Sequence, residues 1–225
     1  MVAALTLPNL NHATGDKETV TRLQKAYSML SEANDRAVAI YGPVSEWSGT
    51  CKRDRDNFSA CWIKRVGEFM KVSSTCITRP ESLYQASSCE FLRGAGDYWA
   101  TDDYWAFMLS DGTAFAINDY DCRDCDCSDD NISDICFPLI HVDINGSKKG
   151  KNTFGTDQFA FSISDSLGVI PYNGSFSSCI SNKDEFCTNW ILDYGNVDYL
   201  KADSAGKCND NPSIILDGVN NTSCH

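Results

Sequence analysis

Two aspartates and an asparagine flank a glycine-rich stretch in the second half of the chain. Asp143 and Asn145 precede this stretch, and Asp157 follows it. Carboxylate and amide oxygens are the hard ligands that calcium prefers, and a glycine-rich turn suits a calcium loop. The same residues can instead cap a turn through Asx hydrogen bonds, while the glycines adopt positive φ. The sequence therefore leaves two interpretations of Asp143, Asn145 and Asp157, a calcium site or a hydrogen-bonded turn.

The 12 cysteines are the second group of candidate functional residues. Their even number suits complete pairing in an oxidising compartment, so we expect local disulfides and a location outside the cytoplasm. Spacing alone does not fix the pairing. A zinc-type site at Cys122, Cys125 and Cys127 is the alternative, but thiolates outside the cell oxidise, and Cys136 offers a fourth partner. The predicted disulfide cysteines are Cys51, Cys61, Cys76, Cys89, Cys122, Cys125, Cys127, Cys136, Cys179, Cys187, Cys208 and Cys224.

Residues for catalysis are sparse. His12, His141 and His225 lie far apart, and neither a GxSxG nor an HExxH motif surrounds any of them. Abundant carboxylates without a recognisable pair do not define an acid and base couple. We therefore expect no catalytic residue, no required cofactor and no enzymatic activity, with calcium as the favoured candidate ion.

Composition narrows the class of partner and the size of the fold. A net charge of -12 and a pI near 4.5 repel nucleic acid phosphates and anionic lipid headgroups, so nucleic acid is not an expected partner. The 225 residues are 42% hydrophobic, which is enough to enclose one core. No run of 18 apolar residues is present, so we expect no transmembrane helix within this chain.

One long amphipathic helix is the clearest element in the sequence. Between Thr14 and Tyr41, apolar residues recur at steps of three and four, and Gly42-Pro43 is a typical helix end. Such an apolar stripe must cover another element of the protein. The residues that we expect to dock this helix onto a sheet are Val20, Leu23, Tyr27 and Leu30.

The expected sheet begins after a long, cysteine-containing connection, 45–96, which we expect disulfides to hold and which includes a short helical stretch near 58–70. Two aromatic-rich runs, 104–109 and 113–117, flank an Asp-Gly turn and predict a hairpin. Further strands are expected at 137–144 and 158–163, and the remainder reads as loops with short strands. The predicted fold class is α+β, a long N-terminal helix packed on a small antiparallel sheet with disulfide-rich loops.

Four segments carry a resemblance to a known family. Val2–Leu10 looks like the end of a hydrophobic segment with a helix-kinking proline at Pro8, and the stretch from Val20 to Ala33 is similar to the amphipathic half of the same helix. The Asp143-Ile144-Asn145-Gly146 run, with the glycines and Asp157 that follow, resembles a prepilin-type signature. The fourth segment is the Cys-x-x-Trp-Ile block that starts at Cys187 and runs to Leu200. In this order the segments resemble type IV pilins and type II secretion pseudopilins.

The resemblance has departures, namely Lys151 in place of a proline, Val197 in place of a methionine and an unusually high cysteine count. It implies one domain made of a helix, 1–41, truncated at its membrane end, and a cysteine-rich head, 42–225. Secretion pseudopilins often hold calcium in a loop comparable to the one around Asp157.

The implied function is a structural subunit of an extracellular or periplasmic filament that is membrane-anchored before assembly. Its partners would be copies of itself or other pilins, and an inner-membrane assembly platform reached through the missing N-terminal segment. The alternative is a minor tip pilin or adhesin that binds a surface or host ligand through loops 119–134 and 179–225. The resemblance leaves pilus and secretion pseudopilus as open choices.

Overall fold

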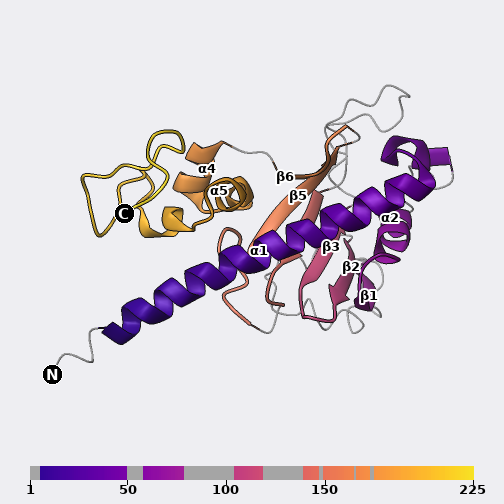
Figure 1. Cartoon of the computed structure of the whole chain (residues 1–225), viewed down its shortest axis with the longest axis horizontal. Coiled ribbons are helices and arrows are strands. Elements are labelled where there is room, and N and C mark those ends of the chain that lie inside the picture. Colours follow the sequence, from indigo (N-terminus) through magenta and orange to yellow (C-terminus); the bar gives the residue numbers. More distant parts are fainter. Residues whose placement is uncertain are drawn as a thin grey trace.

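A computed structural model of the chain describes residues 6–49, 58–78, 104–118, 139–146, 149–164, 166–172 and 175–225. One long helix lies across a six-stranded antiparallel sheet, and short helices and loops form a C-terminal lobe beside it (Figure 1). This confirms the α+β class. The elements are α1 (Thr6–Tyr41), η1 (Val44–Gly49), α2 (Phe58–Gly67), β1 (Val72–Thr78), β2 (Tyr104–Leu109), β3 (Ala114–Asn118), β4 (Leu139–Asp143), β5 (Gln158–Ser164), β6 (Gly168–Pro171), α4 (Phe176–Asn182), α5 (Cys187–Tyr194) and η4 (Asp198–Lys201).

Helix α1 has 36 residues and ends at Tyr41, the predicted residue, but it begins at Thr6 and not at Thr14. Pro8 lies in its first turn, where a missing N–H costs no helical hydrogen bond. Gly42 ends the helix with a φ of 82°, and its N–H donates to the carbonyl oxygen of Val38 at 2.9 Å. At about 1.5 Å per residue the helix is about 54 Å long, and its N-terminal part extends beyond the sheet (Figure 1).

The stripe of α1 that faces the protein is made of small and branched side chains. Its fully or almost fully buried apolar members are Leu23, Ala26, Leu30, Ala33 and Ala37. Between these positions the Tyr27 ring stacks on Phe161 of β5, with centroids 5.7 Å apart. The spacing of three and four residues keeps these side chains on one helical face. The remaining faces carry charged residues, as an amphipathic helix requires.

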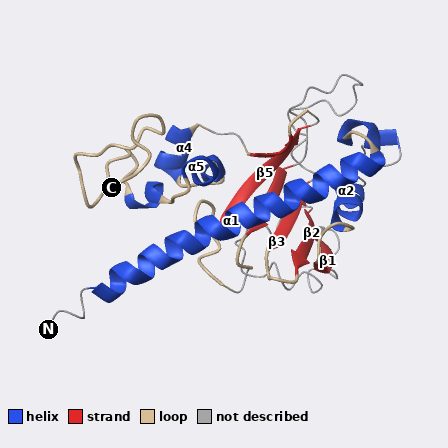
Figure 2. Cartoon of the chain, viewed as in Figure 1, coloured by secondary structure: helices blue, strands red, loops and turns tan. Residues whose placement is uncertain are grey.

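The sheet is a meander with strand order β1 to β6, in which every neighbouring pair is antiparallel. Figure 2 shows its strands behind α1, with helix α2 at the C-terminal end of α1. The face toward α1 is bulky, since Phe107 stacks on Phe115 at 4.9 Å and Phe161 meets Tyr27. On the opposite face, Ala106 of β2, Ala116 of β3 and Ala160 of β5 lie in one cross-strand row with His141 of β4, and the three alanines are fully buried.

The predicted hairpin is confirmed between β2 and β3. The turn is closed by Asp111, whose Oδ1 accepts the Thr113 N–H at 3.1 Å, and Gly112 takes a φ of 93°. Lys25 of α1 forms an ion pair with Asp111 at 2.6 Å. The tip of the hairpin is therefore tied to the helix that covers the sheet.

The C-terminal lobe differs from the loop-like region that the sequence suggested. Helices α4 and α5 are joined by the Cys179–Cys187 disulfide. Trp190 of α5 is fully buried and packs on Phe176 of α4 and Tyr199 of η4. Strand β1 was also missed, since it lies within the predicted connection, 45–96. It pairs with β2 over most of its length.

Candidate functional site

Asp143 ends strand β4 and closes a tight turn by itself. Its Oδ1 accepts the N–H groups of Asn145 at 3.1 Å and Gly146 at 2.6 Å, an Asx-type turn in which Gly146 has a φ of 80°. The side chain is fully buried, and burial raises its pKa to about 6, helped by the nearby carboxylate of Asp157 and opposed by the two backbone N–H groups. Its Oδ2 accepts no hydrogen bond from the described residues.

Asp157 organises the loop that leads into β5. Its Oδ2 accepts the N–H groups of Lys151 at 2.6 Å and Asn152 at 3.0 Å, and its Oδ1 accepts the N–H of Thr153 at 2.8 Å. The Asn145 amide group donates to the same Oδ2 at 3.5 Å. This carboxylate is therefore the centre around which the backbone of residues 151–153 wraps.

Gly150 explains why this arrangement needs glycine. It has a φ of 78°, and a Cβ at this position would lie 2.0 Å from Asp157 Oδ2 and 2.5 Å from the Asn145 amide nitrogen. Any larger residue would push the carboxylate out of its backbone cradle. The glycine-rich stretch thus serves a close approach of backbone and carboxylate as well as positive φ.

The hydrogen bonds of this loop bear on its two interpretations. Calcium needs six to eight oxygen ligands, whereas the Asp157 oxygens already accept backbone N–H groups, which leaves Asp143 Oδ2 and Asn145 Oδ1 as the unpartnered acceptors of the trio. Within the described ranges, no three His, Cys, Asp or Glu side chains gather as a metal-binding group. The trio in this arrangement forms a hydrogen-bonded turn, and calcium binding stays a prediction for calorimetry.

The four predicted docking residues of α1 all lie on its inward side. Leu23 and Leu30 are fully buried in the core, and Val20 and Tyr27 are half-buried against it. Helix α1 contacts strand β6, helix α2 and helix α5. The docking surface is therefore continuous from the sheet to the C-terminal lobe.

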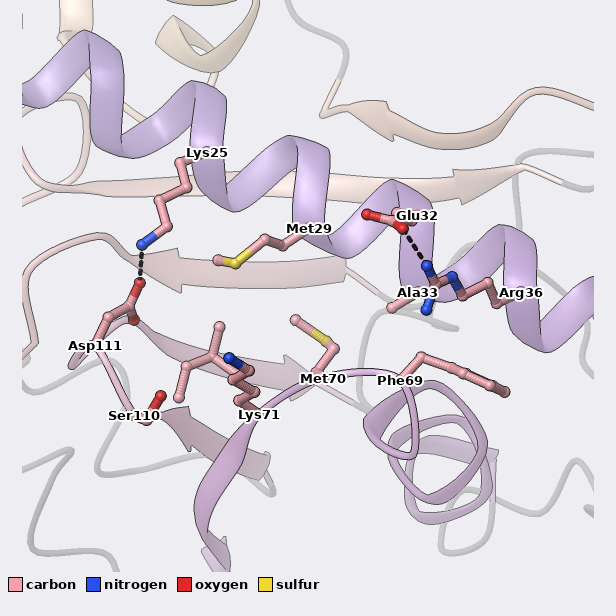
Figure 3. A pocket seen from close by; sticks show the side chains of 11 residues that line it. Lys25, Met29, Glu32, Ala33, Arg36, Phe69, Met70, Lys71, Ser110 and Asp111 are labelled. Carbon is pink, nitrogen blue, oxygen red and sulfur yellow. Dashed lines mark hydrogen bonds and ion pairs between the residues drawn. The ribbon is translucent and has the colours of Figure 1, made fainter.

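A groove runs beside α1 on the side of the β2–β3 hairpin, with a volume of about 350 Å³ (Figure 3). Met29 points into it from the helix and Met70 from the turn before β1 (Figure 3). The Lys25–Asp111 pair lies at one end, and Arg36 pairs with Glu32 along the helix. These four charged side chains form two ion pairs, and Lys71 also lines the groove.

The histidines lie apart in the fold as they do in the sequence. His141 is in β4, almost fully buried, with its ring centroid 5.3 Å from that of Phe154, and burial lowers its pKa to about 3. A neutral, enclosed imidazole of this kind fills space in the core. His225 is exposed at the end of the described chain, and the side chain of His12 lies outside the described residues.

Four of the predicted disulfide cysteines form the bonds Cys179–Cys187 and Cys208–Cys224, and Cys61 at the start of α2 is disulfide-bonded as well. These bonds indicate an oxidising, extracytoplasmic location. The side chain of Cys76 and the cysteines at 51, 89, 122, 125, 127 and 136 lie outside the described residues, as does the 119–134 loop. The zinc interpretation of that loop stays untested.

Comparison with known proteins adds no relative, since no family model, no curated protein and no solved structure matches the chain. Among the described residues, no helix combines the length and the apolar character needed to cross a bilayer. The class that the fold itself defines is an α+β protein with a long N-terminal helix packed on an antiparallel sheet. This architecture is consistent with a pilin-like fold.

Proposed function

We propose that the chain is a structural subunit of a type IV pilus-like or type II secretion pseudopilus filament. The observation that carries the proposal is helix α1, which is buried on the sheet from Leu23 to Ala37 and extends beyond the head at its N-terminal end (Figure 1). A helix of 36 residues that uses only part of its length for its own head has a free part to pack elsewhere.

The N-terminal part of the chain, which includes the projecting turns of α1 (Figure 1), carries no formally charged side chain. Residues 1–15 contain no lysine, arginine, aspartate or glutamate, whereas charged residues are frequent from Asp16 onward. An uncharged helical end buried among copies of itself would leave no unpaired charge in the interface. On this proposal the partners are other subunits of the filament, and a membrane platform assembles them.

A minor tip subunit is the second candidate, and the C-terminal loop supplies the observation in its favour. Ile215 and Val219 belong to the loop closed by Cys208–Cys224, and they are 53% and 79% exposed. These two side chains supply exposed apolar area on a loop whose ends the disulfide holds together. On this variant of the proposal the loop binds a surface or host ligand.

Sheared filaments from the cells that produce the protein test both candidates. We expect tryptic peptides of the chain in the sheared fraction, in large excess if the chain is the main subunit and in trace amount at filament ends if it is a tip subunit. Immunogold labelling of the same filaments distinguishes the two positions. Absence of the chain from every filament of the producing cell would contradict the proposal.

A further inference from the structure

A lysine of the C-terminal lobe holds α1 at the point where the helix leaves the sheet. Lys201 Nζ lies 2.9 Å from Asp16 Oδ2 of α1 and 2.8 Å from Asp198 Oδ1 of its own 3-10 helix. Asp16 is about two turns before Leu23, the first fully buried residue of the stripe. Lys201 is therefore a direct ionic link between the base of the projecting helix and the lobe.

Asp198 connects this lysine to the end of the described chain. It is 2% exposed, and its Oδ2 accepts the Ser223 hydroxyl at 2.7 Å and the Cys224 N–H at 2.9 Å. Burial alone would raise the pKa of Asp198, but the bonds from Lys201, Ser223 and Cys224 outweigh it, so the pKa lies below its usual value. The carboxylate is ionised. Its Oδ1 accepts from Lys201, and its Oδ2 accepts from Ser223 and Cys224.

The disulfide Cys208–Cys224 fixes the last part of the link. Cys224 is 6% exposed, and its disulfide closes the loop whose end presents Ser223 and the Cys224 N–H to Asp198. The Asn196 amide adds a bond to the Thr222 carbonyl oxygen at 3.0 Å. Without the disulfide, Ser223 and Cys224 would be held against Asp198 by hydrogen bonds alone, and the loop 208–224 would gain conformational freedom.

We propose that the Cys208–Cys224 disulfide restrains helix α1 through a series of contacts, which we call the catch. The series runs from Ser223 and Cys224 to Asp198, from Asp198 to Lys201, and from Lys201 to Asp16. The catch holds the first turns of α1 that contact the head, and so fixes the direction in which the rest of the helix projects. Loss of the disulfide releases Asp198 and Lys201 and loosens a helix that is distant in sequence. This inference holds whether or not the chain is a filament subunit.

Amide hydrogen exchange of residues 15–22 tests the catch. In Asp16→Asn we expect faster exchange of this segment, by up to about fivefold for a half-exposed ion pair, with unchanged exchange in the C-terminal loop. In the Cys208→Ser/Cys224→Ser double variant we expect faster exchange in both regions. Asp35→Asn, which makes the same chemical change further along α1, is the control and should leave residues 15–22 as in the wild type.

Two results of these exchange measurements would overturn the proposal. Faster exchange in the C-terminal loop of the double variant, with residues 15–22 as in the wild type, would overturn the proposal. Wild-type exchange in Asp16→Asn would overturn it as well. If the double variant does not fold, Ser223→Ala takes its place, because it removes the hydroxyl that donates to Asp198 on the disulfide side; residues 15–22 should then exchange faster, and wild-type exchange there would overturn the proposal.

Discussion

Asn34 is a polar residue in the apolar stripe of α1, and its replacement by leucine should stabilise the protein. The side chain is 1% exposed, and neither its Oδ1 nor its Nδ2 has a hydrogen-bond partner among the residues that the structure describes. It lies over the start of β6, where a Cβ on Gly168 would be 3.9 Å from the Asn34 amide nitrogen. Burial of such an amide costs its hydration free energy, and no hydrogen bond within the protein offsets that cost.

The expected change in the free energy of unfolding follows from three stabilising contributions and one destabilising contribution. Relieving the unpaired amide is worth about 1–3 kcal/mol. Leucine has the better helix propensity, by about 0.5 kcal/mol, and buries an apolar side chain worth about 1.5–3 kcal/mol. Imperfect fit of the branched side chain subtracts about 1–2 kcal/mol. We therefore expect Asn34→Leu to raise the free energy of unfolding by about 1–5 kcal/mol.

Urea denaturation followed by tryptophan fluorescence, with the disulfides intact, measures this difference. Asn196→Leu is the matched control, because the Asn196 side chain accepts from Trp190 Nε1 and the Asp198 N–H, both at 2.9 Å. The same substitution there should lower the free energy of unfolding by about 2–4 kcal/mol. If Asn34→Leu destabilises the protein while Asn196→Leu behaves as expected, the interpretation of Asn34 as an unpaired group is wrong.

Four further predictions concern the core, a turn, pH and calcium. Leu30→Asp should destabilise the protein by more than about 4 kcal/mol, because it buries a charge against the sheet; unchanged melting would argue against docking by this residue. Gly218→Ala should cost about 1–3 kcal/mol, since φ is 70° and the new Cβ would lie 2.4 Å from the Phe176 Cβ; urea denaturation measures it, and no loss would refute the close approach. Because the folded pKa of Asp143 is raised from 3.8 to about 6, its contribution to stability is present below pH 3.8 and is lost as pH rises through 6. In EDTA, the stability of Asp143→Asn relative to wild type should therefore increase between pH 4 and pH 7, and a constant difference would contradict the shift. Calorimetry with added calcium should give no heat if the loop around Asp157 is a hydrogen-bonded turn, and a saturable heat would establish the calcium interpretation.

The main helix could be predicted because its own sequence determines it. Leu23 and Leu30 repeat with the helical period, and Gly42 ends the helix where the sequence indicated. The resemblance implied a helix over 1–41, whereas the apolar period alone did not reach the first turns, because Pro8 and the asparagines around it show no such period. Those residues are helical because they extend an existing helix, which costs no new nucleation.

The missed elements depend on contacts that a pattern does not reveal. Strand β1, with the sequence V-S-S-T-C-I-T, is poor in large apolar residues, and it forms a strand because β2 offers it hydrogen bonds. Helix α5 has eight residues, too few to be stable alone, and it is held by the Cys179–Cys187 bond and by the burial of Trp190. Pairing of cysteines cannot be deduced from spacing, so these supports were invisible.

The loop at Asp143 and Asp157 was predicted as a cluster, and its chemistry was left open for a physical reason. Whether Asp157 binds an ion or backbone N–H groups depends on the backbone angles of Gly150 and its neighbours, which the sequence only permits. The link from Asp16 to Lys201 was out of reach as well, because the two residues meet only when the C-terminal lobe docks beside α1.

An electron cryomicroscopy map of native filaments from the producing cells, at side-chain resolution, tests the proposed role most directly. We predict density for this chain in which α1 runs continuously from the head into the filament interior, packed against α1 of neighbouring subunits, with the six-stranded sheet toward solvent. Filaments built from this chain with α1 outside the interior, or an interior filled entirely by another protein, would contradict the proposed role.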